Sequence, residues 1–167
     1  MNGKPIRTAV ITGGHSFNVV DFYHLFRQLE GIDAYLQHMD DFASSSATVR
    51  NSYDVLLFYT MLLDGPTDDG LPWYAGKPRS TLEQLGQTEQ GIFMLHHSIL
   101  AYREWPIWNQ LVGLPDLSHD VTMAQTLPVE VVDPDHPITE GLSDWEIVDE
   151  TYQMCDPDPQ SQALLTT

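Results

Sequence analysis

The chain has 167 residues, a length that fits one domain with a core of its own. Its 24 acidic and 7 basic residues give a formal net charge of −17, which repels phosphate backbones and anionic membranes. We therefore expect no nucleic acid and no membrane as partner, and the single cysteine, Cys155, excludes an intrachain disulfide bond.

The N-terminal residues lack the apolar core of a signal peptide. Residues 7–14, RTAVITGG, form one short β-type run that ends in two glycines. No apolar run in the chain approaches the ~20 residues that a membrane-spanning helix needs. We expect a cytoplasmic protein.

Strands and helices are predicted to alternate along the first two thirds of the chain. Apolar runs predict strands, and periodic patterns predict helices. In residues 17–31 the apolar residues Phe22, Leu25, Phe26 and Leu29 share one helical face. In residues 80–91 Ser80 and Glu83 have the spacing of a capping box. The predicted strands are 7–14, 32–39, 54–62 and 92–95, and the predicted helices are 17–31, 44–53, 80–91 and 102–113.

The rest of the chain reads as a long loop and three later strands. Residues 64–79 are rich in Gly, Pro and Asp, and long loops in compact domains are often functional. The later strands are predicted at 126–132, 145–154 and 163–167. This order of elements predicts one domain, residues 1–167, with a mostly parallel sheet between helices.

Histidines follow the first and fourth predicted strands. Ligands of such sheets bind at the carboxyl ends of the strands, which places His15, His96 and His97 where a site is expected. If the fourth strand continued through the histidine pair, the two side chains would point to opposite faces. We expect His97 to face the site.

Two further groups are candidates for binding. Gly13 and Gly14 allow a ligand to approach the backbone before His15. The motif DETY, residues 149–152, supplies two carboxylates and a tyrosine; a solvated strand end is the alternative reading. Since no clustered Cys/His motif is present, any metal site must be assembled from separate loops.

Five segments, taken together, resemble the ThuA-like (trehalose utilisation) family. They occur in the expected order, as VITGGHSF, YDVLLFY, GIFMLHHSILAYREWPIW, DPDHPITEGL and DETYQM. The resemblance implies an α/β fold of the class I glutamine amidotransferase-like type, a flavodoxin-like three-layer sandwich. It also implies a bacterial protein of disaccharide use.

The resemblance carries residue roles onto this chain. True amidotransferases have a nucleophilic cysteine at the strand elbow, where this chain reads LHHS with His97 approximately at the elbow, so a cysteine-dependent glutamine amidotransferase is not expected. The Gly-Gly-His turn of the family falls on residues 13–15, and its acidic motif falls on Asp149, Glu150 and Tyr152.

These features lead to a hypothesis of a carbohydrate-active enzyme for a glycoside or keto-sugar derivative. We expect His97 as base, His15 as electrophile or metal ligand, and Glu150 as partner acid or ligand. These three are also the candidate ligands of a divalent metal such as zinc. The expected substrate-binding residues are Gly13, Gly14, Trp73, His96, Asp149 and Tyr152.

Two other functions stay open, a sugar-binding or regulatory domain without chemistry and a metal-dependent hydrolase of amides or esters. Family members usually continue with a further strand and a Gly-His-Asp segment, whereas this sequence ends at Thr167. We therefore expect either a fragment or a site that another chain completes, which makes a homo-oligomer a candidate assembly.

Overall fold

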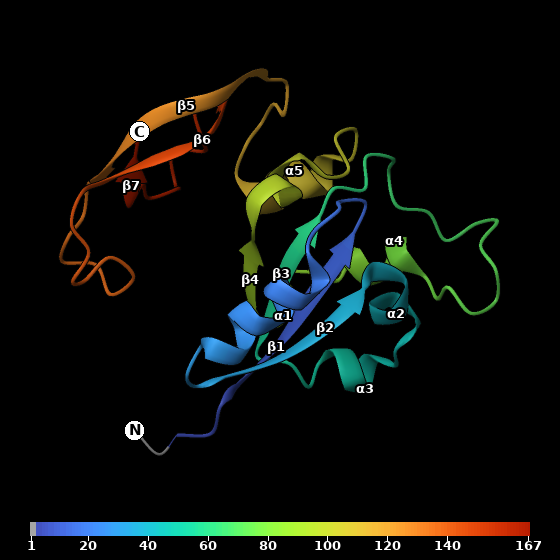
Figure 1. Ribbon diagram of the computed structural model, residues 1–167. Coiled ribbons are helices and arrows are strands. Elements are labelled where there is room, and N and C mark those ends of the chain that lie inside the picture. Colours follow the sequence, from blue (N-terminus) through green and yellow to red (C-terminus); the bar gives the residue numbers. More distant parts are fainter. Residues whose placement is uncertain (1–2) are drawn as a thin grey trace. The chain divides into compact units, whose positions relative to one another are not determined.

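The computed structural model describes residues 3–167 and divides the chain into two compact units (Figure 1). The first ends at Val112 and the second is Gly113–Thr167, and each is described by itself. The sequence predicts one domain over residues 1–167. Among the described residues, no helix is long and apolar enough to cross a membrane.

The first unit contains a parallel sheet of four strands in the order β2-β1-β3-β4. Each strand coincides closely with an apolar run of the sequence, which is typical of buried parallel sheets. The bounds are β1 Ile6–Gly13, β2 Ile32–His38, β3 Val55–Thr60 and β4 Gly91–Met94. The order reverses at β1, because the chain leaves β1 toward β2 and later returns to its other side as β3.

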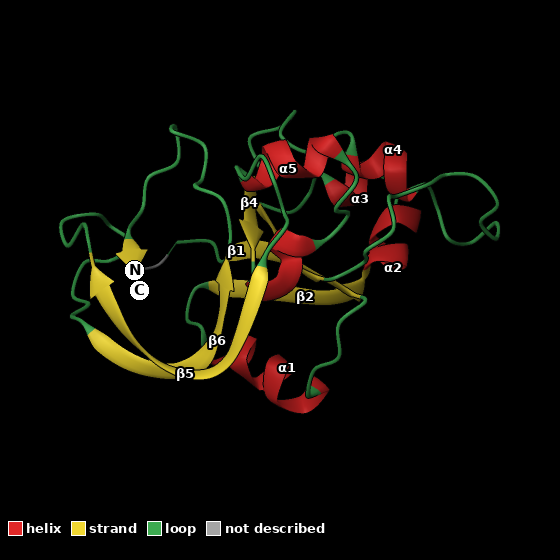
Figure 2. Ribbon diagram, turned by 90° about the horizontal axis from the view of Figure 1, so that it is seen from above, coloured by secondary structure: helices red, strands yellow, loops and turns green. Residues whose placement is uncertain are grey.

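Helices lie on both faces of this sheet, with α1 on one face and α4 and α5 on the other (Figure 2). Asn18 starts α1, since its side chain accepts hydrogen bonds from the N–H groups of Val20 and Asp21. The helices are α1 Val19–Gln28, α2 Met39–Ser44, α3 Ala47–Arg50, α4 Pro78–Leu82 and α5 Pro106–Val112.

The main core lies on the α2, α4 and α5 face of the sheet. Strand side chains alternate, so Leu56 and Phe58 of β3 enter this core, and the ring of Phe58 packs edge-on against Trp108 at 5.3 Å. Tyr59 points to the opposite face, where its ring lies 4.8 Å from Phe22 of α1. This alternation decides which β3 residues can reach the carboxyl edge on the α1 side.

The predicted helix over residues 80–91 is wrong in its bounds. The structure has α4 over Pro78–Leu82, followed by turns that lead to β4. Proline is favoured at the first helical position, so Pro78 rather than Ser80 begins the helix. Glu83 pairs with Arg79 instead of closing a capping box.

Two other helical predictions are corrected. The helix predicted over 102–113 begins only at Pro106, and a 3-10 helix over His96–Leu100 precedes it. Along α1, Phe26 is buried, but Leu25 and Leu29 are 48% and 45% exposed, so the apolar stripe is only partly covered.

The second unit is an antiparallel sheet in the order β6-β5-β7. The strands are β5 Asp120–Val131, β6 Trp145–Gln153 and β7 Leu165–Thr166. A bulge interrupts the β5–β6 register between Thr122 and Gln125, where Ala124 takes a left-handed φ of 53°. The later strands of the sequence therefore form a sheet of their own.

Candidate functional site

The carboxyl ends of β1 and β3 meet at the point where the strand order reverses. Gly14 follows β1 with a φ of 70°, and a Cβ there would lie 2.7 Å from the carbonyl carbon and oxygen of Met61. The two segments are held together, because the N–H of Met61 donates to the Gly13 oxygen at 2.8 Å. The glycine turn is therefore required by close backbone packing at the place where such sheets bind ligands.

His15 follows this turn and lies between a side chain of β3 and one of the 3-10 helix after β4. Its Nδ1 lies 3.1 Å from the hydroxyl oxygen of Tyr59 in β3. Its Nε2 lies 2.8 Å from Nδ1 of His97, which follows β4. Both ring nitrogens of His15 therefore have a partner. The series Tyr59–His15–His97 links residues at the carboxyl ends of β3, β1 and β4.

The backbone turns sharply at His96, which has a φ of 56°. Left-handed conformations are costly for residues with a Cβ and tend to mark functional turns. The sequence places His97 approximately at the elbow; the structure gives the strained conformation to His96, one residue earlier. Strand β4 ends at Met94, so the alternation expected of a continued strand does not apply to the histidine pair.

Ser98 fixes this elbow from within the core. Its side chain is buried and donates to the Phe58 oxygen at 2.6 Å, while its Oγ accepts from the Thr60 N–H at 2.8 Å. The indole N–H of Trp108 donates to the Ser98 carbonyl at 2.9 Å. These bonds occupy the Ser98 hydroxyl in structural roles and tie the histidine elbow to the end of β3.

The elbow and the glycine turn bring three imidazoles together. The ring centroid of His15 lies 4.7 Å from that of His97 and 5.2 Å from that of His96. One nitrogen from each ring lies within 4.8 Å of the others. His96 is exposed, whereas His15 and His97 are half-buried, so the cluster opens to solvent on the His96 side.

This arrangement supports two kinds of chemistry. Neutral imidazoles transfer protons near neutral pH. Three histidines are also a ligand set for catalytic zinc, which keeps a fourth position for water or substrate. The structure brings His96 into the cluster as a third possible ligand, a position for which the sequence suggests Glu150.

Tyr59 is a site residue that sequence reasoning missed. Its ring stacks on that of His96 with centroids 5.9 Å apart and an interplanar angle of 13°. Burial raises the pKa of the Tyr59 phenol, so its hydroxyl stays protonated at neutral pH. The alternation of the predicted strand could have found Tyr59, because it lies on the face opposite Leu56 and Phe58, close to the carboxyl end of the strand.

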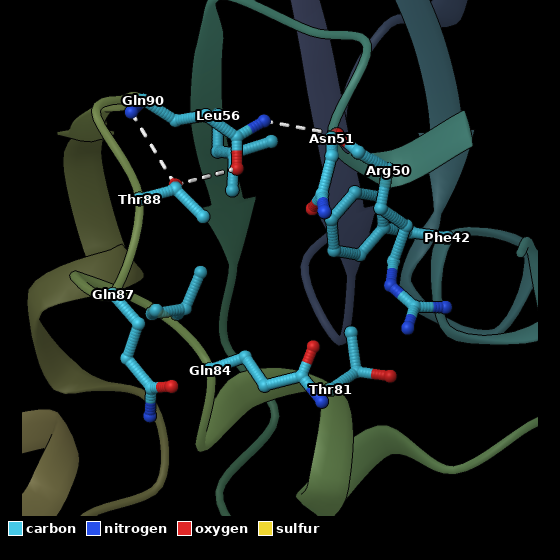
Figure 3. A pocket seen from close by; sticks show the side chains of 10 residues that line it. Phe42, Arg50, Asn51, Leu56, Thr81, Gln84, Gln87, Thr88 and Gln90 are labelled. Carbon is cyan, nitrogen blue, oxygen red and sulfur yellow. Dashed lines mark hydrogen bonds between the residues drawn. The ribbon is translucent and has the colours of Figure 1, made fainter. Parts of the chain in front are cut away.

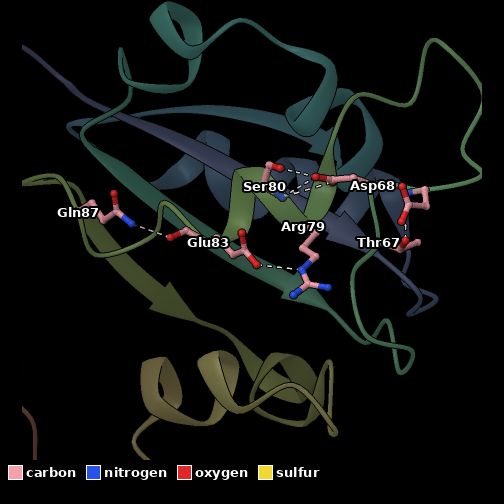
Figure 4. Close-up of polar contacts among 7 residues, drawn as sticks. Thr67, Asp68, Arg79, Ser80, Glu83 and Gln87 are labelled. Carbon is pink, nitrogen blue, oxygen red and sulfur yellow. Dashed lines mark hydrogen bonds and ion pairs between the residues drawn. The ribbon is translucent and has the colours of Figure 1, made fainter.

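The loop after β3 is anchored at its base by Asp68 (Figure 4). The Asp68 carboxylate accepts from the N–H of Ser80 at 3.2 Å and from the Ser80 hydroxyl, and so caps the first turn of α4. Desolvation raises the pKa of Asp68, but the hydrogen bonds from Ser80 and from the Arg79 N–H, together with the charge of Lys77, outweigh it and hold the pKa below its usual range.

Trp73 stands at the exposed part of this loop. Its side chain is 94% exposed and its ring packs edge-on against Tyr74 at 5.7 Å. Its role in substrate binding stays a prediction.

The acidic motif lies on β6 of the second unit. The Tyr152 hydroxyl donates to Glu150 at 2.8 Å, and the Tyr152 ring lies 5.2 Å from that of His119. Desolvation, together with the bond to Glu150, raises the pKa of Tyr152 to about 12. Asp149 accepts from the N–H of Glu150 at 2.8 Å. The roles expected for these residues stay predictions.

A pocket of about 170 Å³ lies near the amino ends of β3 and β4, at the end of the strands opposite to the histidines (Figure 3). Its polar side chains are mostly amides, among them Asn51 before β3 and Gln90 before β4. The Gln90 amide donates to the carbonyls of Arg50 and Tyr53 at 2.9 and 2.8 Å. Gln90 therefore links the segments that precede β3 and β4, at the amino ends of these strands and away from the histidines.

The parallel sheet, its strand order and the elbow after β4 define a flavodoxin-like fold of the class I glutamine amidotransferase-like type. Residues 28–167 match the ThuA family, described as trehalose utilisation, and the chain belongs to this family. Family membership implies a role in trehalose utilisation. The matched residues include His96 and His97 and begin after His15.

Two solved structures are similar to this chain. A ThuA-like protein from Bacteroides uniformis ATCC 8492 has a TM-score of 0.66 at 17% identity, covering 99% of this chain and 69% of its own. A GMP synthase subunit from Thermoplasma acidophilum has a TM-score of 0.45 at 15% identity, covering 90% of this chain and 68% of its own. The comparison with curated proteins found no match. At such identity the first likeness shows the fold alone.

Proposed function

We propose that this protein is a carbohydrate-active enzyme that acts on a glycoside or a keto-sugar derivative. The observation that carries the proposal is the convergence of His15, His96 and His97 at the carboxyl edge of the parallel sheet, with one nitrogen of each within 4.8 Å of the others. The family's role in trehalose utilisation supports a sugar as substrate.

The favoured reaction is elimination from a 3-keto glycoside. The carbonyl at C3 makes the neighbouring C2 proton acidic. Nε2 of His97 takes this proton, the electron pair forms the C1–C2 double bond, and the C1–O bond breaks. His96, exposed beside the cluster, donates a proton to the leaving oxygen when it is protonated. His15 orients the base, because its Nε2 lies 2.8 Å from Nδ1 of His97.

A metal-dependent hydrolase of an amide or ester is the second candidate, supported by the same three imidazoles. The donor set fits zinc, which is commonly held by three histidines in catalytic sites. A divalent ion there would supply Lewis acidity and an activated water. In this alternative His15, His96 and His97 are ligands, and none of them is the base.

Metal content and turnover, measured together, separate the two candidates. We expect purified protein treated with a chelator to retain turnover of a 3-keto glycoside, and His97→Ala to lose it. His24→Ala is the matched control, because His24 is an exposed histidine of α1. A near-stoichiometric divalent ion whose removal abolishes ester or amide hydrolysis would favour the second candidate. Sugar binding without any turnover would contradict both.

A further inference from the structure

We infer that Tyr59 is a positioning residue that accepts a hydrogen bond from Nδ1–H of His15 and thereby fixes the tautomers of both His15 and His97. The inference rests on the proposed function, in which His97 acts as a base. It adds to the site a residue from β3, a strand that contributes no histidine.

The geometry links the three side chains in series. The Tyr59 hydroxyl oxygen lies 3.1 Å from Nδ1 of His15, and Nε2 of His15 lies 2.8 Å from Nδ1 of His97. Both distances are those of hydrogen bonds. Tyr59 therefore acts on His97 through His15.

Protons can be arranged along this series in only two ways when both imidazoles are neutral. A neutral imidazole has one N–H and one lone pair, so the direction of one hydrogen bond sets the direction of the next. If Tyr59 accepts from Nδ1–H of His15, then Nε2 of His15 accepts from Nδ1–H of His97, and Nε2 of His97 keeps a lone pair. If Tyr59 donates instead, Nε2 of His97 carries a proton and cannot act as a base.

The proposed role of His97 selects the first arrangement. It leaves the basic nitrogen of His97 on the side away from His15. In this arrangement the lone pair on Nε2 of His15 accepts the hydrogen bond from Nδ1–H of His97. Histidines at functional centres are commonly oriented in this way, by donating their other ring N–H to an oxygen acceptor.

The surroundings of Tyr59 hold its oxygen in place. Its ring packs against Phe17 at 5.5 Å and Phe22 at 4.8 Å, and it stacks on His96. These contacts use the ring and not the hydroxyl, so Tyr59→Phe removes the acceptor and keeps the packing. Burial raises the pKa of Tyr59, which keeps a neutral phenol beside the imidazoles.

The test is the tautomer of each histidine, read from nitrogen-15 chemical shifts in the full chain freed of metal, at alkaline pH where imidazoles are neutral. We expect His15 and His97 both as Nδ1–H tautomers, although free histidine in water prefers the Nε2–H form. In Tyr59→Phe we expect both to shift toward Nε2–H. Wild-type histidines in the Nε2–H form, or shifts unchanged in the variant, would overturn the inference.

Tyr53→Phe is the matched control, because it also removes a tyrosine hydroxyl close to β3. Tyr53 precedes the amino end of the strand, and its hydroxyl accepts a hydrogen bond from the Gln37 amide at 3.1 Å. We expect it to leave the histidine shifts unchanged. For 3-keto glycoside turnover, Tyr59→Phe should lower kcat by about 10- to 100-fold with little change in KM. The expected tautomers without turnover of any sugar would contradict the proposed function alone, and full turnover by Tyr59→Phe would contradict the inference alone.

Discussion

Nδ1 of His97 lies 2.8 Å from Nε2 of His15, although 82 residues separate them in the chain. The contact exists because parallel strands bring their carboxyl ends to one edge, where β1 and β4 each release a histidine. Its two supports are a glycine turn packed on Met61 and a strained elbow at His96. The contribution of each support to the free energy of unfolding can be measured without an activity assay.

The left-handed backbone at His96 predicts an inversion of the usual ranking of alanine and glycine. His96→Ala and His96→Gly both remove the imidazole, so the two variants differ in the backbone at a φ of 56°. We expect His96→Gly to have the higher free energy of unfolding by about 1 kcal/mol, because glycine adopts this region without the Cβ penalty. Urea denaturation measures the difference. A more stable His96→Ala would show that the elbow carries no strain.

The turn after β1 predicts a large cost for a single methyl group. In Gly14→Ala the Cβ would meet the Met61 carbonyl at 2.7 Å, so we expect a loss of about 3 kcal/mol in the free energy of unfolding. Gly31→Ala is the matched control, since Gly31 has a φ of 80° with nothing within 4 Å of its Cβ. It should lose about 1 kcal/mol. Equal losses would argue against close packing of Gly14 on Met61.

The strands were the most predictable part of this fold. A short, continuous apolar run is typical of a strand that is buried on both faces of a parallel sheet. The run that forms β3, Val55–Thr60, is an example. The helix at 80–91 failed because its start is set by Pro78 and by Asp68, a cap from a distant loop that local spacing cannot reveal. A local pattern therefore predicts an element better than it predicts where the element begins.

The candidate site was predictable in its location and less so in its membership. His15 and the histidine pair follow strands whose carboxyl ends share an edge, which sequence order alone implies. Tyr59 was missed because a tyrosine in an apolar run reads as a core residue. That both His96 and His97 join the cluster depends on β4 ending at Met94, a boundary that the apolar pattern does not fix.

The Asp68 cap predicts a pH dependence of stability in the acid range. A carboxyl whose pKa is lowered by folding stabilises the fold above its unfolded pKa, ordinarily 3.8, and this stabilisation is lost as the pH falls through the folded value. We expect the stability difference between wild type and Asp68→Asn to be constant above about pH 5 and to shrink below pH 3.8. Urea denaturation across this range measures it.

The control for this prediction is Asp69→Asn, because Asp69 is the exposed neighbour in the same loop. Because Asp69→Asn leaves the hydrogen bonds between Asp68 and Ser80 in place, the loss of stability that the cap causes in the acid range should appear in this variant as in wild type. An Asp68→Asn profile that matches the Asp69→Asn profile would show that the cap on α4 does not couple to folding.

The isotope effect at C2 of a 3-keto glycoside tests the central claim most directly, since His97 is proposed to break this C–H bond. Turnover of the C2-deuterated substrate should be slower than that of the protonated one by a primary isotope effect, and His97→Ala should abolish turnover of both. Absence of turnover, or equal rates with the two substrates together with full activity of His97→Ala, would contradict the account.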